Sequence, residues 1–433
     1  MAERGTVKQK NFFFGGWDVE ELAEMFGTPL YVYSEEAVRS RCKEARETFM
    51  RRPHGALAVY AGKAFLPMAM CRIVASEGLG LDVVSGGELH TAVLADFPME
   101  KVFFHGNSKT GEEISYAIRA GVGRIVADGP SELERIEKAA GKAGRRVNVL
   151  LRITPEVDAH THKYIMTGQA GSKFGFPISE GILAETVEKY MKSEYLSLKG
   201  FHFHIGSQIF ENESHVMSVG ILIKIMAGLA REKGFVTEEL NMGGGFGVEF
   251  DPKKKSPSLA SFTDSMLEAL EAGCRSEGIP VPGAFIEPGR WIVSEAGITL
   301  YTVQEIKTTG GITYAAVDGG MTDNPRPALY GARYYAVVPG KADLAATETV
   351  TVAGKCCESG DILIEGLKTP PLERGDLIAV LNTGAYTFSM ASNYNRIPRP
   401  AAVLVSPGRA DIIAERQTWD DLVRWDRIPD HLC

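Results

Sequence analysis

The chain has 433 residues, of which 44% are hydrophobic and 24% charged, and its formal net charge is −8. This length exceeds one ordinary hydrophobic core and predicts two or three domains of a soluble globular protein. The negative charge argues against a nucleic-acid-binding surface, which needs clustered lysine and arginine.

The N-terminus and the cysteines indicate the compartment. No apolar run approaches the roughly 20 residues that cross a bilayer, and the first ten residues lack the hydrophobic segment of a signal peptide. Six cysteines are scattered without CxxC spacing, which favours reduced thiols over a disulfide framework. We therefore expect a cytoplasmic protein with no membrane partner.

Between residues 36 and 290, short apolar runs alternate with amphipathic helical patterns such as Glu132–Ala143 and Ser179–Lys192. The candidate strands are Ala56–Ala61, Leu79–Val84, Lys101–His105, Arg124–Ala127, Val147–Ile153, Leu198–Ile205, Glu239–Met242 and Pro282–Ile286. Eight strand–helix units in this length predict a (β/α)₈ TIM-type barrel. An open doubly wound α/β sheet would alternate in the same way.

Reactive residue types at the strand ends favour the barrel, because barrel enzymes gather their catalytic groups there. In chain order they are Lys63, Asp82, Ser85, Asn107, Asp128, Arg152, His204, Ser207, the glycines from Gly243, Glu287 and Arg290.

After Arg290 the pattern changes to short strands bounded by glycine and proline. The candidate strands are Thr299–Thr308, Tyr314–Val317, Thr349–Val352, Leu377–Leu381 and Ala401–Val405, and helical periodicity returns at Trp419–Trp425. We predict a C-terminal all-β domain over residues 291–433. Residues 12–35 are expected to contribute a strand to it, at Pro29–Tyr33.

Lys63 directly follows an apolar strand, so it would lie at the barrel mouth. Partial desolvation there makes an amine neutral and nucleophilic, able to form a Schiff base with an aldehyde. An ordinary surface lysine is the alternative.

The glycines of Gly243–Gly247 follow the seventh predicted strand. Successive glycines let backbone N–H groups approach an anion, and barrels commonly bind phosphate on the loops after strands seven and eight. A tight turn is the alternative.

Glu287 and Arg290 follow the eighth strand. A buried carboxylate there could hold a pyridine nitrogen protonated, and Arg290 offers a forked donor for a carboxylate or phosphate. A structural ion pair between the two is the alternative.

His202 and His204 share one face of their strand. His204 could lie flat against a pyridine ring as a neutral base. The rival is a zinc site with His105 or His90 as further ligands.

These elements, together with the adjacent Cys356 and Cys357, resemble the fold-type-III pyridoxal phosphate (PLP) decarboxylases from about Pro29 to Tyr394. The resemblance implies a PLP cofactor, a barrel followed by a β domain, no resident metal, and a homodimer with two shared active sites. The substrate-side motifs are similar to those of members that decarboxylate diaminopimelate: Met321–Gly331, Thr167-Gly168, Ser172–Gly175 and Cys357–Asp361. Lys355 and Phe65 depart from the family pattern.

The resemblance also implies a role for each residue. Lys63 would be the Schiff-base lysine, His204 would stack on the ring, and Glu287 would pair with the pyridinium. Ser207, Gly244, Gly245 and the segment Glu287–Arg290 would bind phosphate, and Tyr386 would close the cofactor site. Asp82, Glu88 and Arg152 would lie under the cofactor. The substrate would be held by Arg290, Arg326, Tyr330, Glu358 and Tyr386. Cys357 and Glu358 would come from the partner subunit, with Cys357 a candidate proton donor.

The implied reaction converts meso-2,6-diaminopimelate to L-lysine and CO₂, the last step of lysine biosynthesis. A decarboxylase of ornithine, arginine or lysine is an alternative, disfavoured by the two arginines and Glu358. A non-catalytic regulatory homologue is a further alternative, although Lys63, Glu287 and Cys357 all remain. A zinc-dependent barrel hydrolase is the most distant one.

Overall fold

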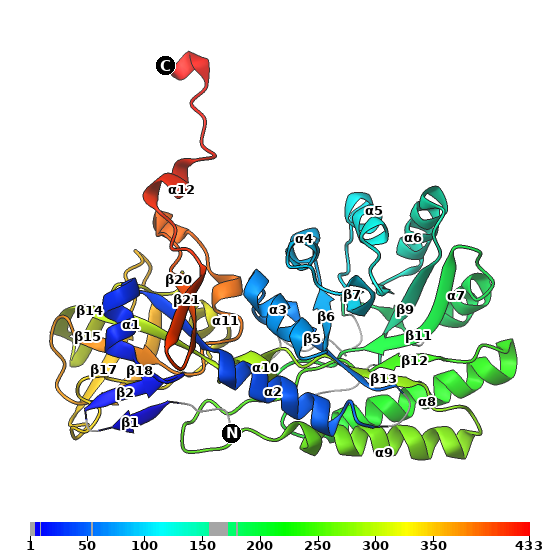
Figure 1. The fold of residues 1–433 in the computed structure, drawn as a ribbon, viewed down its shortest axis with the longest axis horizontal. Coiled ribbons are helices and arrows are strands. Elements are labelled where there is room, and N and C mark those ends of the chain that lie inside the picture. Colours follow the sequence, from blue (N-terminus) through cyan, green and yellow to red (C-terminus); the bar gives the residue numbers. More distant parts are fainter. Residues whose placement is uncertain (1–4, 9, 53–54, 156–171, 179–180) are drawn as a thin grey trace. The chain divides into compact units, whose positions relative to one another are not determined.

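The computed structural model describes residues 5–8, 10–52, 55–155, 172–178 and 181–433. The chain forms two compact units (Figure 1). One unit comprises residues 39–249 and 255–292, and the other comprises residues 1–38, 250–254 and 293–433.

In the first unit, eight parallel strands among the described residues close into a barrel. They are β5 (Leu57–Ala61), β6 (Gly80–Val83), β7 (Val102–Phe104), β8 (Arg124–Ala127), β9 (Val147–Thr154), β11 (Leu196–Phe203), β12 (Glu239–Asn241) and β13 (Gly283–Ile286). β13 pairs back onto β5, and β8 pairs with β9, so the sheet has no open edge. The predicted TIM-type barrel is confirmed, and the open-sheet alternative is wrong.

Helices alternate with these strands on the outside of the barrel (Figure 1). They are α2 (Glu35–Thr48), α3 (Met68–Ser76), α4 (Gly86–Leu94), α5 (Gly111–Ala120), α6 (Pro130–Ala143), α7 (Ile182–Tyr190), α8 (Glu213–Lys233), α9 (Leu259–Glu277) and the short α10 (Arg290–Val293). Local sequence sets their ends: Thr110 and Glu113 form a capping box at the start of α5, and Gly121 ends it in the left-handed conformation.

The barrel interior explains why its strands read as uninterrupted apolar runs. Val59, Phe103, Val126, Leu150 and Phe285 form one buried cluster contributed by five different strands. These parallel strands are covered on both faces, by this cluster inside and by helices outside. Apolar and polar residues therefore alternate only weakly along each strand. The two-residue strand β10 (Phe176–Pro177) pairs with the end of β9.

Helix α8 is long and apolar enough to cross a membrane by length and composition alone. About half of its apolar window is buried, with Val219, Leu222 and Met226 on the buried face. It packs against α9. Partial burial against a neighbouring helix is typical of a helix in the outer layer of a barrel.

The second unit is rich in sheet. Its principal strands are β4 (Leu30–Ser34), β14 (Gly297–Thr309), β15 (Ile312–Val317), β16 (Ala336–Val337), β17 (Glu348–Ala353), β18 (Ile362–Thr369), β19 (Leu377–Val380), β20 (Ala401–Ser406) and β21 (Arg409–Ala414). Among the described residues they follow the order β18-β17-β15-β14-β4-β20-β21, with β19 also on β14. β4 pairs antiparallel with β14 and parallel with β20, so a strand from near the N-terminus lies inside this sheet.

The predicted β domain is confirmed as a sheet-rich unit, which also contains short helices. A small sheet of β1 (Thr6–Lys8), β2 (Asn11–Phe14) and β3 (Trp17–Asp18) precedes helix α1 (Val19–Phe26). Two further short helices are α11 (Arg326–Tyr330) and α12 (Trp419–Val423). Phe12, Phe14 and Leu22 pack in one cluster with residues of β4 and β20, which covers one part of the main sheet.

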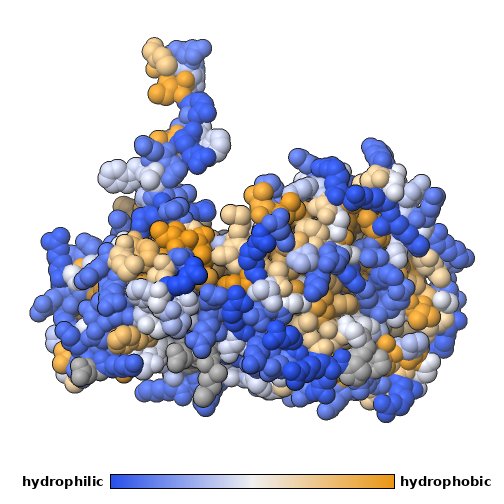
Figure 2. All heavy atoms as spheres, in the orientation of Figure 1, coloured by the Kyte–Doolittle hydropathy of each residue, from blue (hydrophilic) through white to orange (hydrophobic). Residues whose placement is uncertain are grey.

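The C-terminal segment runs away from β20 and β21 (Figure 1). Trp419 and Trp425 are 82% and 75% exposed, and Ile428 and Leu432 are similarly uncovered. Figure 2 shows hydrophobic spheres gathered at the far end of this segment.

Candidate active site

The C-terminal ends of the barrel strands bring most of the predicted cofactor-site residues together. Lys63 is the second residue after β5, and Glu287 directly follows β13. Strand pairing places Arg152 of β9, His202 of β11 and Asn241 of β12 in register across three neighbouring strands. Ionisable and amide side chains therefore converge at one end of the barrel, where TIM barrels place their catalytic groups.

Glu287 is a buried acid of this group, with 5% of its surface exposed. Its Oε1 atom accepts a 2.7 Å hydrogen bond from Asn241 Nδ2 and lies 2.9 Å from His105 Nε2. Its Oε2 atom lies 3.3 Å from His202 Nε2. Burial alone would raise the pKa of Glu287, but the two histidines hold it well below its usual value. The carboxylate is therefore ionised.

His202 and His204 have different partners, although both belong to one strand end. Burial lowers the pKa of His202 to about 3, so this ring is neutral beside Glu287. Burial, with the charge of Lys63, also holds the pKa of His204 well below its usual value. His204 Nδ1 accepts a 3.2 Å hydrogen bond from the backbone N–H of Gly244, so its proton is on Nε2.

The glycine loop after β12 has no room for side chains. A Cβ atom on Gly243, Gly244 or Gly245 would lie only 2.4, 2.1 or 2.3 Å from a backbone oxygen of Phe203, Glu287 or Gly206. Gly243 and Gly245 also have positive φ angles, of 67° and 92°. Glycine is therefore required by both space and backbone conformation, and the N–H groups of this loop lie beside His204 and Glu287.

Ser207 and Arg290 meet on the same side of the barrel. Arg290 Nη2 donates a 3.2 Å hydrogen bond to Ser207 Oγ, and Arg290 is 5% exposed. The alternative of a Glu287–Arg290 ion pair is not supported. The described ion-pair contacts of the Glu287 carboxylate are to the rings of His105 and His202.

Asp82 and Glu88 lie within the electrostatic reach of Lys63. Burial raises the pKa of Asp82, and it raises that of Glu88 to about 7 although the Val84 N–H donates to Glu88 Oε2 at 2.7 Å. Asp82 Oδ1 lies 3.8 Å from His105 Nε2.

Arg152 lies 4.0 Å from Asp128 Oδ1, and its guanidinium lies over the Phe174 ring at 4.3 Å. This contact brings the predicted Ser172–Gly175 motif to the barrel mouth. The other part of that motif, Thr167-Gly168, falls outside the described residues.

In the second unit, Arg326, Tyr330 and Tyr386 form one group. The Arg326 guanidinium lies 5.1 Å from the Tyr330 ring centroid and 5.6 Å from that of Tyr386. Arg326 is 6% exposed, and its buried Nε atom has no hydrogen-bond partner. Among the described ion pairs of this unit, none neutralises Arg326. A buried cation of this kind is suited to an anionic ligand.

Cys357 and Glu358 lie on an exposed loop, whereas Cys356 is buried. Asp361 fixes this loop, since its two carboxylate oxygens accept from the Met321 N–H at 2.6 Å and from the Cys356 N–H at 2.8 Å. Asp361 therefore joins the loop to the Met321–Gly331 motif. The Cys357 N–H donates a 2.7 Å hydrogen bond to Asn395 Oδ1.

One observation supports the alternative of a zinc site. Ligand atoms of His105, His202 and Glu287 all lie within 4.8 Å of one another, a spacing that a metal ion accepts. The predicted ligand set differs from this group: His204 bonds the glycine loop, and His90 lies 3.0 Å from the Tyr116 hydroxyl.

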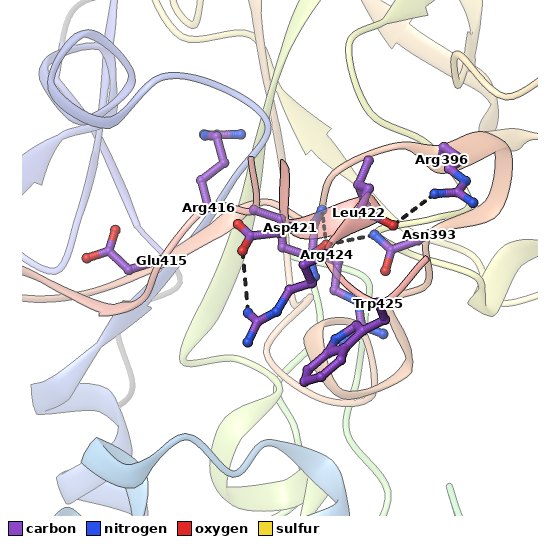
Figure 3. Close-up of a pocket in the computed structure, with 10 residues that line it drawn as sticks. Asn393, Arg396, Glu415, Arg416, Asp421, Leu422, Arg424 and Trp425 are labelled. Carbon is purple, nitrogen blue, oxygen red and sulfur yellow. Dashed lines mark hydrogen bonds and ion pairs between the residues drawn. The ribbon is translucent and has the colours of Figure 1, made fainter. Parts of the chain in front are cut away.

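Two cavities lie outside these groups. One, of about 570 Å³, lies at the base of the C-terminal segment, where Arg396 bonds the Leu422 carbonyl and Arg424 pairs with Asp421 (Figure 3). The other, of about 520 Å³, is lined by residues of α4, α5 and their neighbouring loops, including Phe97 and Tyr116. Neither contains a predicted site residue.

Sequence reasoning did not identify Asn241, or the contact of His105 and His202 with Glu287. Asn241 lies two positions before the predicted glycine loop, and its place at the end of a predicted strand is the signal that could identify it. His105 was considered only as a metal ligand.

Comparison with known proteins gives one result throughout. Residues 35–294 match the sequence model of the family described as pyridoxal-dependent decarboxylase, pyridoxal binding domain. The chain is 45% identical over 430 residues to diaminopimelate decarboxylase of Bacillus subtilis, covering 98% of both chains. It is similar to the crystal structure of diaminopimelate decarboxylase from M. jannaschii, with a TM-score of 0.93 and 36% identity over 100% of this chain and 99% of that one. The complex of that enzyme with L-lysine matches with a TM-score of 0.93 and 35% identity, over the same shares of the two chains. The chain therefore belongs to the pyridoxal-dependent decarboxylase family, in the branch of the diaminopimelate decarboxylases.

Proposed function

We propose that this chain decarboxylates meso-2,6-diaminopimelate to L-lysine and CO₂ with pyridoxal phosphate as cofactor. The observation that carries the proposal is the likeness to B. subtilis diaminopimelate decarboxylase, at 45% identity over 98% of both chains. A relative that differed in substrate would be expected to diverge in the substrate-side motifs, and those motifs are the ones most typical of this branch.

The residues at the barrel mouth fit this cofactor. The glycine loop packs so closely against neighbouring backbone that no Cβ atom fits, and its N–H groups are suited to a phosphate. Glu287 is a buried, ionised carboxylate suited to a protonated ring nitrogen. His204 is neutral, as a ring that stacks on a pyridine should be.

We assign the roles accordingly. Lys63 would hold the cofactor covalently through Nζ, and Ser207, Gly244, Gly245 and Arg290 would hold its phosphate. Tyr386 closes the site, while Asp82, Glu88 and Arg152 support it. Pyridoxal phosphate, when bound, supplies an electron sink for the electron pair that the departing carboxyl group leaves.

The substrate's distal end carries an ammonium and a carboxylate. Arg326 supports the carboxylate assignment because it is a buried guanidinium without an acidic partner in the described part of its unit. Tyr330 lies against it, and we assign Arg290 and Tyr386 to the same carboxylate. Glu358 takes the ammonium. Cys357 Sγ delivers a proton to the carbon that has lost CO₂, which gives L-lysine.

We also propose a cytoplasmic homodimer with two shared active sites, without nucleic-acid or membrane partners. Two observations support a second copy. Cys357 and Glu358 are exposed on a loop that Asp361 and Asn395 hold in a fixed conformation. Trp419 and Trp425 are largely uncovered in the nearby C-terminal segment.

We place the cofactor domain at residues 36–290 and the second domain at 291–433 with a strand from 12–35. The family match over 35–294 supports these bounds.

A CO₂-release assay tests the proposal. The purified protein, loaded with pyridoxal phosphate, is given meso-diaminopimelate, L-lysine, L-ornithine and L-arginine in parallel. We expect CO₂ from meso-diaminopimelate with a kcat/KM at least about a hundredfold above the others, because unpaired buried charges penalise substrates that lack one distal group. Preference for ornithine, arginine or lysine would establish the sister activity instead, and no release from any of them would support the non-catalytic alternative.

A further inference from the structure

Glu287 is surrounded by nitrogen atoms from three different strand ends, His105, His202 and Asn241, which we call the donor cage. We infer that the donor cage keeps the proton shared with a bound cofactor on the ring nitrogen and off the Glu287 carboxylate. Asn241 and His202 are its positioning residues. This inference rests on the proposed function, since it concerns the cofactor assigned to the same site.

The contacts of Asn241 fix the direction of its amide. Its Oδ1 atom accepts a 3.0 Å hydrogen bond from the Gly243 N–H, and its Nδ2 atom donates at 2.7 Å to Glu287 Oε1. The backbone N–H of Glu287 also donates to the Gly243 carbonyl, at 2.7 Å. Asn241 therefore joins the glycine loop, assigned to phosphate, to the carboxylate assigned to the ring nitrogen.

The two oxygens of Glu287 are occupied unequally. Oε1 accepts a 2.7 Å hydrogen bond from Asn241 Nδ2 and lies 2.9 Å from His105 Nε2. Oε2 has only His202 Nε2, at 3.3 Å, among its described contacts. The geometry assigns Oε2 as the oxygen that faces the ring proton.

The charges around Glu287 come from every neighbouring strand end. Asp82 of β6 opposes its ionisation, whereas His105 after β7 and His202 of β11 favour it, and Arg152 of β9 lies within electrostatic reach. His202 is neutral, with a pKa of about 3. It therefore acts as a hydrogen-bond donor and leaves the negative charge of Glu287 available to a ring cation.

Donors to a carboxylate favour its charged form and so lower its affinity for a proton. One hydrogen bond to a charged group changes such an equilibrium by about one to two powers of ten. Removing a donor should move the shared proton from the ring nitrogen toward Glu287. The ring would then be a weaker electron sink, although its phosphate would still be bound.

The test is ¹⁵N NMR of the holoenzyme loaded with pyridoxal phosphate labelled at the ring nitrogen. The variants are Asn241→Leu and His202→Leu, which remove a donor at similar volume. Asn148→Leu is the matched control, because Asn148 is also a barrel-strand asparagine but donates to the Gly123 carbonyl at 3.1 Å, away from Glu287. His202→Gln keeps an N–H donor and should behave as wild type.

We expect a protonated-nitrogen resonance in the wild type, in Asn148→Leu and in His202→Gln. In Asn241→Leu and His202→Leu the resonance should shift toward the neutral-pyridine position, and kcat should fall about tenfold or more while the cofactor Kd changes less than about threefold. Unshifted resonances in both variants would overturn the inference, as would an unprotonated ring in the wild type.

Failure of the proposed function gives a different result. A wild type that binds no pyridoxal phosphate would refute that function before the variants are measured. Stoichiometric zinc bound through His105, His202 and Glu287 in place of the cofactor would refute both.

Discussion

Lys109 and Glu132 form an ion pair inside the barrel unit, with 3.0 Å between Nζ and Oε1 and side chains only 1% and 5% exposed. Lys109 Nζ also donates to the carbonyls of Gly106 and Val126, at 2.8 and 2.7 Å. Glu132 Oε2 accepts from the Asp128 N–H at 2.7 Å. The pair therefore ties the loop after β7 to the loop after β8, next to the predicted site.

Breaking this pair from one side should be costly. Lys109→Met leaves the Glu132 carboxylate buried without its cation, so we expect a loss of about 3–5 kcal/mol in the free energy of unfolding. The double variant Lys109→Met/Glu132→Leu should recover part of that loss. Urea unfolding of Lys109→Met, Glu132→Leu, the double variant and wild type measures the coupling, and strictly additive losses would contradict it.

Lys63→Ala should abolish decarboxylation and the visible absorption band of lysine-bound cofactor. The barrel should remain folded, because Lys63 is half-buried at a strand end and not part of the core. Activity, absorbance and circular dichroism are measured on the same sample. Near-normal turnover with the band intact would show that another lysine anchors the cofactor.

Arg326→Ala should cost about 2–5 kcal/mol in kcat/KM for meso-diaminopimelate, as removal of one member of a buried charge pair does. The loss for L-lysine, which lacks a distal carboxylate, should be far smaller. Arg333→Ala, at an exposed arginine of the same unit, is the control. An unchanged ratio of the two kcat/KM values would remove Arg326 from the substrate site.

Homodimers of Lys63→Ala and of Cys357→Ala should both be nearly inactive. If each site takes Lys63 from one chain and Cys357 from the other, a mixed dimer carries both defects in one site and none in the other. Refolding the two variants together should restore activity that neither has alone. Mixed dimers detected by mass spectrometry without such recovery would place both residues of a site on one chain.

Asp323 gives a prediction about pH. Burial raises its pKa from the ordinary range of an aspartate to about 7. The folded state therefore keeps a proton that the unfolded state releases above about pH 4, and the resulting stabilisation is lost as the pH rises toward 7. Asp323→Asn cannot ionise, so its unfolding free energy should fall less between pH 4 and 7 than that of wild type. Urea unfolding across this range checks it, with Asp343→Asn, an exposed aspartate, as control; parallel curves for Asp323→Asn and wild type would contradict it.

The barrel could be predicted from sequence because its strands are apolar on both faces and glycine or capping residues separate them from the helices. All eight candidate strands lie within two residues of the observed bounds. The second unit was harder to predict. β18 was missed because Glu365, Gly366 and Lys368 interrupt its apolar residues, and β16 because two residues carry no pattern.

The site divides in the same way. Lys63, the glycine loop and Glu287 could be recognised because each follows a strand and has a distinctive residue type. The donor cage could not, because Asn241 and His105 acquire their significance only from a carboxylate that follows another strand. The spacing of His202 and His204 puts them in one group. In the structure His202 contacts the Glu287 carboxylate, whereas His204 accepts a hydrogen bond from the Gly244 N–H.

The pairing of β4 also has a consequence for synthesis on the ribosome. Its two neighbours, β14 and β20, begin at Gly297 and Ala401. The nascent chain thus carries an unpaired strand, Leu-Tyr-Val-Tyr-Ser, throughout the translation of the whole barrel, and such an edge is open to association with other chains. The barrel can fold before β4 is paired, but the second unit is complete only after β20 and β21 have left the ribosome. A chain that ends after the barrel should therefore fold its barrel but expose the unpaired strand β4, which can associate with other chains.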